Sequence, residues 1–126
     1  MTVSIRAVLD WEMATIGDPL MDLGSTLGYW IDPTDPPELL AASFGPTLRA
    51  GNLNRAELVE RYARASGRDI SNIKFYYVYA LFKIAVIAQQ IYKRWHVGAS
   101  RDERFAGFGE KVKALGNVAG REIARG

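Results

Sequence analysis

Residues 71–95 are predicted to form a long helix at the centre of a helical bundle. Apolar residues recur there at three- and four-residue steps on two faces, which is typical of a helix packed on more than one side. One face carries Phe75, Val78, Tyr79, Phe82 and Val86, and a second carries Tyr77, Leu81, Ile84, Ala88 and Ile91. Lys83, Gln89 and Gln90 interrupt the apolar run, so we expect a buried core helix and no membrane span.

A first helix is predicted well before this segment. Asp18 is a good N-cap and Pro19 suits the first helical position. Asp22 follows in the first turn, where the helix dipole favours negative charge. The proline-rich turn at residues 32–37 ends the helix, because proline removes a backbone donor and fixes φ.

Two further helices and one ambiguous segment complete the helical prediction. Asn54 and Glu57 have the spacing of a capping box, and Gly67 closes the helix that they begin. Residues 38–44 are compatible with a short helix, and apolar spacing predicts a last helix at residues 102–124.

The N-terminal residues are predicted to form a strand that ends at a pair of carboxylates. Residues 3–9 alternate apolar side chains, and Asp10 follows directly. On an extended segment Asp10 and Glu12 lie on the same side, with Trp11 on the other. Neighbouring carboxylates repel each other unless a cation or a shared proton lies between them, and oxygen-only ligands suit Mg²⁺. Asp10 and Glu12 are therefore candidate metal ligands.

Structural roles compete with this interpretation. A carboxylate at the end of a strand, such as Asp10, often only caps a turn, and Glu12 then is an exposed acid beside it. For Asp18 and Asp22, capping and dipole effects explain both residues without a ligand.

Composition limits the range of functions. The chain of 126 residues fits a single domain, and its formal net charge of +2 is too small to indicate a nucleic-acid partner. Because the chain has no cysteine, disulfides and thiol catalysis are excluded, and a cytoplasmic location is natural. Residues 1–50 carry two basic and seven acidic side chains, whereas residues 93–126 carry eight basic and four acidic ones.

The segment at residues 8–24 also resembles a known family. It reads VLDWEMATIGDPLMDLG and is similar to the metal-binding segment of the aminoglycoside phosphotransferase/choline kinase-like family. Within that family, the segment resembles the branch that is related to the kinase-like domain of acyl-CoA dehydrogenase homologues. Supporting similarity comes from the segments LVERY at residues 58–62, SGRD at 66–69, FYY at 75–77 with Phe82 and Lys83, and RDER at 101–104.

The resemblance implies a mainly α fold, the helical C-terminal subdomain of a protein-kinase-like fold with a short N-terminal β-strand. Residues 1–18 are then the strand and metal-binding turn, and residues 19–126 the helical subdomain of a single domain. The resemblance also implies that Asp10 binds the Mg²⁺ that bridges the phosphates of ATP, with Glu12 as a second acid near the metal. The implied reaction is transfer of the γ-phosphoryl group of ATP to a hydroxyl of a small acceptor molecule.

The sequence departs from the family's pattern at the catalytic centre. It contains no Gly-x-Gly-x-x-Gly motif and no His-Gly-Asp…Asn catalytic loop, and its single histidine, His96, follows the long helix. We therefore expect no catalytic residue in this chain and no phosphoryl transfer by the chain alone, with Mg²⁺ and ATP used by the complete domain.

A non-catalytic helical module that mediates interaction or oligomerisation is the alternative function. An unpaired strand at residues 3–9 would be open to another chain, so we expect a homo-oligomer formed through it.

Overall fold

The computed structural model describes residues 4–43 and 45–126, and this part of the chain is built from helices and connecting loops. Its α-helices are α1 (Pro19–Tyr29), α2 (Pro37–Ala41), α3 (Arg55–Ser66), α4 (Ile73–His96) and α5 (Phe108–Ala124). Short 3-10 turns lie at Trp11–Met13, Pro46–Leu48 and Glu103–Phe105. The mainly α prediction is confirmed.

The predicted strand is the clearest correction. Residues 4–10 form no strand, and residue 3 lies outside the described part of the chain. A strand is stable only when another strand accepts and donates its backbone hydrogen bonds, and the described residues contain no strand that could pair with it. The extended arrangement expected for Asp10 and Glu12 is therefore also wrong, because residues Trp11–Met13 form a 3-10 turn.

Helix boundaries follow the capping signals. The Asp18 carboxylate accepts a hydrogen bond from the Leu20 backbone N–H at 2.9 Å, which begins α1. Asn54 and Glu57 form the predicted capping box at the start of α3. Gly67 ends α3 with a positive φ of 67°, a conformation that glycine adopts without a Cβ penalty.

The last helix begins later than the sequence pattern indicated. Asp102 caps a 3-10 turn at Glu103–Phe105, accepting from the Arg104 backbone N–H at 3.0 Å, and α5 starts only at Phe108. The turn and the glycine at position 107 separate the two helical pieces.

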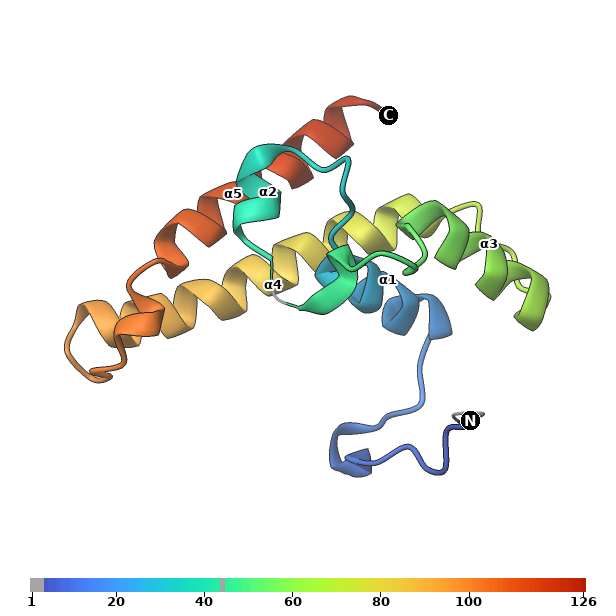
Figure 1. Ribbon diagram of the computed structural model, residues 1–126, viewed down its shortest axis with the longest axis horizontal. Helices are drawn as coiled ribbons and strands as arrows, with labels where there is room; N and C mark the ends of the chain where they lie inside the picture. The colour runs from blue at the N-terminus through green and yellow to red at the C-terminus, as the bar shows by residue number, and fades with distance from the viewer. Residues whose placement is uncertain (1–3, 44) are drawn as a thin grey trace.

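Helix α4 is the axis of the fold, and Figure 1 shows it crossing the whole molecule with α1 and α5 beside it. Helix α1 approaches it through two glycines. A Cβ added at Gly24 would lie 2.7 Å from the Tyr76 Cβ, and one added at Gly28 would lie 2.8 Å from the Ile84 Cδ1. At Gly24 the added Cβ would also meet the Tyr76 backbone, so only glycine permits this helix spacing there, whereas at Gly28 the Ile84 side chain would have to move.

Helix α5 covers a second face of α4 and completes the core. Four large side chains are fully buried there: Ile31, Leu39, Leu81 and Leu115. The short helix α2 contributes Leu39 to this cluster, so the segment that the sequence left ambiguous also packs against α5.

No described element covers the third face of α4. Phe75 and Phe82 are each 63% exposed, Tyr79 is 43% exposed and Val86 is 39% exposed. The prediction that α4 is buried on two faces is correct for the Leu81 and Ile84 side and wrong for this one. In the described part of the chain, no helix combines the length and the apolar character needed to cross a membrane.

Candidate functional site

Asp10 lies in an unusual backbone conformation. Its φ of 71° and ψ of 49° are left-handed, and among the described residues it is the one non-glycine with a positive φ. Aspartate tolerates this region better than most residues. The Trp11 indole N–H donates to the Val8 carbonyl at 2.6 Å, and this hydrogen bond closes a tight bend at residues 8–11. Asp10 lies in this bend and is exposed to solvent.

Glu12 lies in the 3-10 turn that follows, and both carboxylates are exposed to solvent. Their donor set contains only oxygen, which fits Mg²⁺, a cation that keeps several water ligands and uses one or two protein carboxylates. Over the described residues, no group of three or more His, Cys, Asp or Glu side chains is close enough to enclose a metal ion. The roles of Asp10 and Glu12 as metal ligands therefore remain a prediction.

Asp18 has the structural role that its position favours. One carboxylate oxygen caps α1 and the other accepts a hydrogen bond from the Tyr76 hydroxyl of α4. The bond from Tyr76 and the bond from the Leu20 backbone lower the pKa of Asp18 below its ordinary value. The same bond to Asp18 raises the pKa of Tyr76. Asp18 thereby fixes the start of α1 to α4.

An open cavity of about 630 Å³ joins the N-terminal segment to the helices. Its walls come from the turn after Asp10, the first turns of α1 and the uncovered face of α4, and include Trp11, Ile16, Asp18, Asp22, Tyr79 and Lys83. The predicted metal-binding turn and the bare face of α4 are therefore neighbours in space, and Lys83 supplies the cavity with a cation.

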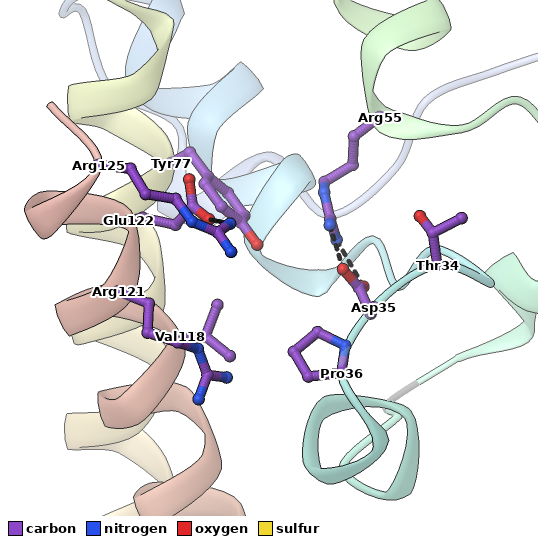
Figure 2. Close-up of a pocket in the computed structure, with 9 residues that line it drawn as sticks. All are labelled: Thr34, Asp35, Pro36, Arg55, Tyr77, Val118, Arg121, Glu122 and Arg125. Carbon is purple, nitrogen blue, oxygen red and sulfur yellow. Dashed lines mark hydrogen bonds and ion pairs between the residues drawn. The ribbon is translucent and has the colours of Figure 1, made fainter.

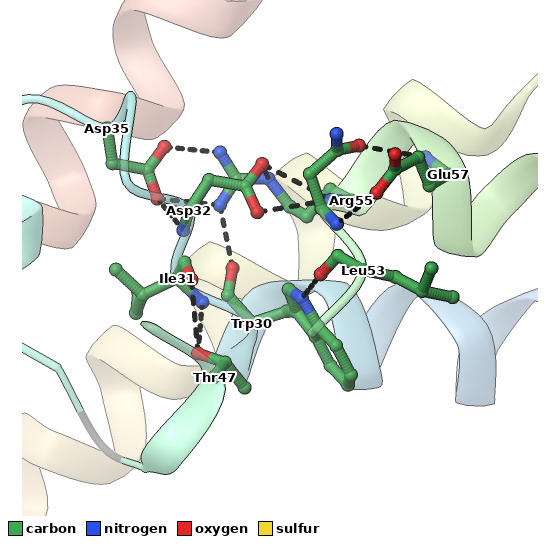
Figure 3. Close-up of polar contacts among 9 residues, drawn as sticks. Trp30, Ile31, Asp32, Asp35, Thr47, Leu53, Arg55 and Glu57 are labelled. Carbon is green, nitrogen blue, oxygen red and sulfur yellow. Dashed lines mark hydrogen bonds and ion pairs between the residues drawn. The ribbon is translucent and has the colours of Figure 1, made fainter. Parts of the chain in front are cut away.

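A polar network that sequence reasoning missed ties the end of α1 to the start of α3 (Figure 3). The buried carboxylate of Asp35 pairs with the Arg55 guanidinium, whose Nη1 also donates to the Trp30 carbonyl at 2.7 Å. Asp32, also buried, accepts from the Arg55 backbone N–H at 3.1 Å. The spacing Asp32-Pro-Thr-Asp35 was the signal, but we interpreted it only as a helix stop.

The Arg55 side chain also forms one wall of a second cavity, of about 510 Å³, shown in Figure 2. The Tyr77 ring lies beside it, with the guanidinium carbon of Arg55 5.1 Å from the ring centre. Burial, opposed by the charge of Arg55 and reinforced by nearby acids, raises the pKa of Tyr77 to about 12. Tyr77 therefore stays a neutral phenol at physiological pH.

Charges in this second cavity are balanced within the protein. Besides the Arg55 pair, Arg121 bonds Glu38 at 2.5 Å and Arg125 bonds Glu122 at 3.0 Å. Because each arginine has a carboxylate partner, the cavity does not resemble an anion site.

Comparison with known proteins agrees with the N-terminal motif. The sequence pattern of the phosphotransferase enzyme family (APH) matches residues 2–76, a range that includes the Asp10 turn, α1 and the start of α4. The chain belongs to this family.

The chain is also similar to individual proteins. The chain is 34% identical over 116 residues to the acyl-CoA dehydrogenase family member 11 of Gallus gallus, covering 88% of this chain and 15% of that protein. It is 33% identical over 126 residues to the probable acyl-CoA dehydrogenase IBR3 of Arabidopsis thaliana, covering 96% and 15%. The human family member 11 is 33% identical over 113 residues, covering 88% and 14%.

The chain thus spans about a seventh of the length of these relatives. No solved structure matches it. The resemblance to a phosphotransferase and to its branch among acyl-CoA dehydrogenase homologues is confirmed.

Proposed function

We propose that this chain is the C-terminal helical part of an ATP-dependent phosphotransferase that acts on a small hydroxylated molecule. The observation that carries the proposal is the family match, because it covers residues 2–76 and so includes both Asp10 and Glu12. The exposure of Asp10 on a tight bend supports it, since its carboxylate is accessible to a nucleotide-bound metal.

In the proposed reaction the acceptor hydroxyl oxygen attacks the γ-phosphorus of ATP. The bond to the bridging oxygen breaks, ADP leaves, and the hydroxyl proton passes to a base. Mg²⁺, when bound, neutralises the charge on the transferring phosphoryl group. Asp10 would hold that metal through its carboxylate, and Glu12 would contribute negative charge near it.

This chain by itself lacks the partners for the reaction. Its sequence has no glycine-rich nucleotide loop and no His-Gly-Asp…Asn motif to supply the base. We propose that the chain alone is inactive, and that phosphoryl transfer requires a complete domain in which these motifs complement Asp10. We propose that the protein works in the cytoplasm. The chain has no cysteine, so it contains no disulfide that an oxidising compartment would have to form.

The test uses a complete domain that joins these residues to the nucleotide and catalytic loops. Substitution Asp10→Asn suits it, because asparagine also tolerates the left-handed conformation, so that the change removes charge and leaves the bend. Consumption of Mg²⁺-ATP with a panel of hydroxylated acceptors should fall by at least about 100-fold, in the range of losing one preorganised electrostatic group.

Glu60→Gln is the matched control, because Glu60 is an exposed acid on α3 whose side chain is 66% exposed. It should leave turnover unchanged. Near-normal turnover by Asp10→Asn would refute the metal assignment, and turnover by the chain of residues 1–126 alone would refute its proposed inactivity.

A further inference from the structure

Helix α3 is attached to the molecule differently from the other helices. In the part of the chain that the structure describes, extensive helix–helix packing joins α4 to α5, α1 to α4 and α2 to α5, and α3 takes part in none of these pairs. It is also the one described α-helix without a buried residue, although it spans 12 residues. Figure 1 shows it at the edge of the molecule. Burial of apolar side chains therefore contributes little to holding α3 in place.

An open cavity lies between α3 and the helices behind it. Its volume is about 460 Å³, and its apolar walls come from Leu27 of α1, Val59 and Ala63 of α3, and Ile73 and Tyr77 of α4. We call this space the α3 groove. Close-packed protein interiors leave few voids larger than a water molecule, so the apolar side of α3 faces the core without filling the space in front of it.

The polar contacts between α3 and other elements are concentrated at its first residue. The Arg55 guanidinium pairs with Asp35 and donates to the Trp30 carbonyl at 2.7 Å. The side-chain hydrogen bonds described for later residues of α3 stay within the helix or its flanking turns, such as the bond from Arg64 to Glu60 at 3.1 Å. Arg55 is therefore the polar link that holds α3 to the rest of the molecule.

Glycines in left-handed conformations lie on both sides of α3. Gly51 precedes the helix with a φ of 90°, and Gly67 follows it with a φ of 67°. Glycine changes its backbone angles at little steric cost, so both connections are able to absorb a movement of the helix. The capping box between Asn54 and Glu57 is local to α3 and moves with it.

We propose that α3 is a movable strap over the α3 groove and that Arg55 is its latch. When the bonds of Arg55 to Asp35 and to the Trp30 carbonyl break, α3 separates from α1 and α4, which stay folded, and the groove opens to solvent. In the separated state water solvates the guanidinium and the carboxylates, so opening costs less than unpairing the same charges inside the closed protein. The proposal rests on the packing and hydrogen bonds of α3 and is independent of the phosphotransferase assignment.

Thiol labelling tests the opening, because the chain has no cysteine and one introduced thiol reports on one site. Leu27→Cys places the thiol in the groove wall at a position that is 3% exposed. Leu115→Cys is the matched control, because Leu115 is 0% exposed in the core and does not line the groove. The reagent is excess 5,5′-dithiobis(2-nitrobenzoate), and urea unfolding of each variant gives the rate expected from global unfolding alone.

Leu27→Cys should react at least about 10-fold faster than Leu115→Cys, because a local opening has a lower free energy than global unfolding. Its rate should also rise less steeply with urea, since the separation of one helix exposes less surface than unfolding does. Circular dichroism checks that both variants keep their helix content.

Arg55→Ala tests the latch. Added to Leu27→Cys, it should raise the labelling rate by at least about 10-fold, because it removes the cation that the buried carboxylates require in the closed state. Arg64→Ala is the matched control. It should leave the rate unchanged, because the pair of Arg64 with Glu60 lies within α3 and moves with the helix.

Spin labels at exposed positions test the latch without a change in the core. The distance distribution between labels at Arg61→Cys of α3 and Gln90→Cys of α4 should broaden when Arg55→Ala is added. The distribution between labels at Gln90→Cys and Asn117→Cys of α5 should stay the same, because α4 and α5 remain packed together.

Labelling of Leu27→Cys and Leu115→Cys at equal rates, with the same urea dependence, would make α3 part of the cooperative core and would overturn the proposal. Labelling of Leu27→Cys at the rate of a fully exposed thiol would also overturn it, because α3 would then not cover the groove. An unchanged labelling rate and an unchanged distance distribution in Arg55→Ala would show that Arg55 is not the latch.

Discussion

At the scale of single residues, two glycines decide how closely α1 and α4 approach. Gly24 and Gly28 are both buried, and an added Cβ would overlap Tyr76 at the first position and Ile84 and Ala80 at the second. At Gly24 the overlap includes the backbone carbonyl of Tyr76 at 2.7 Å, so the clash cannot be relieved by a rotamer change. The spacing of four residues between the glycines matches one face of a helix.

Gly24→Ala should therefore lower the free energy of unfolding by about 2 kcal/mol, within the range measured for overpacked cores. Gly116→Ala is the matched control, because Gly116 lies in the interior of α5 with no heavy atom within 4 Å of an added Cβ. That change should raise stability by about 0.5–1 kcal/mol through helix propensity. Urea unfolding measures both, and a stability gain by Gly24→Ala would show that the two helices are less tightly packed than described.

At the scale of helices and turns, the Arg55 network holds the first helix to the third. Asp32 and Asp35 are 8% and 9% exposed, so their charges are largely removed from water. Burial lowers the pKa of Arg55, but its bond to Asp35 and the charges of both acids outweigh this effect and raise the pKa overall. The guanidinium therefore remains charged, and the two buried carboxylates depend on it.

Arg55→Ala should lower the free energy of unfolding by about 3 kcal/mol, because it leaves buried carboxylates without their cation. Arg64→Ala removes an exposed pair with Glu60, in which both side chains are at least 66% exposed, and should cost less than about 0.5 kcal/mol. Thermal unfolding compares the two variants. Equal losses would indicate that the Asp32 and Asp35 carboxylates are solvated and need no partner.

These elements also show how far the sequence can be interpreted. The starts of α1 and α3 were predictable because a cap depends on residues within one turn, as at Asp18 and Asn54. The Asp35–Arg55 pair was not, because its members lie 20 residues apart and meet only in the folded chain. The exposure of the α4 face with Phe75 and Phe82 was not predicted either, since apolar spacing identifies a face and does not show whether another element covers it.

The residues of the candidate site could be identified from the sequence, but their geometry could not. The sequence identified Asp10 and Glu12 as acids in a family motif, and their roles as ligands remain predictions. Their geometry was wrong in the sequence interpretation, because the β-conformation expected there depends on a neighbouring strand that the described residues do not contain. The left-handed conformation of Asp10 has no local sequence signal apart from the general tolerance of aspartate for it.

At the scale of the whole molecule, the predicted metal turn and the helical core are energetically separate. Ile5, Leu9 and Ile16 are 87%, 80% and 103% exposed, so the N-terminal segment adds little buried apolar area. The core is built by α4 and α5 with Leu39 of α2, α1 packs against α4, and the bond between Asp18 and Tyr76 anchors the start of α1 without the preceding residues. The segment carrying Asp10 is thus held in the fold mainly at Asp18.

Deletion of residues 1–16 should therefore leave the helical core intact, with a change in unfolding free energy within about 0.5 kcal/mol, as for surface changes away from buried contacts. The denaturant m-value should also stay the same, because it scales with the area exposed on unfolding and the deleted residues are already exposed. Urea unfolding followed by circular dichroism measures both quantities. A marked fall in the m-value would mean that residues 4–16 pack against α1 or the exposed face of α4 in solution, and then the Asp10 turn would be a structural part of the core.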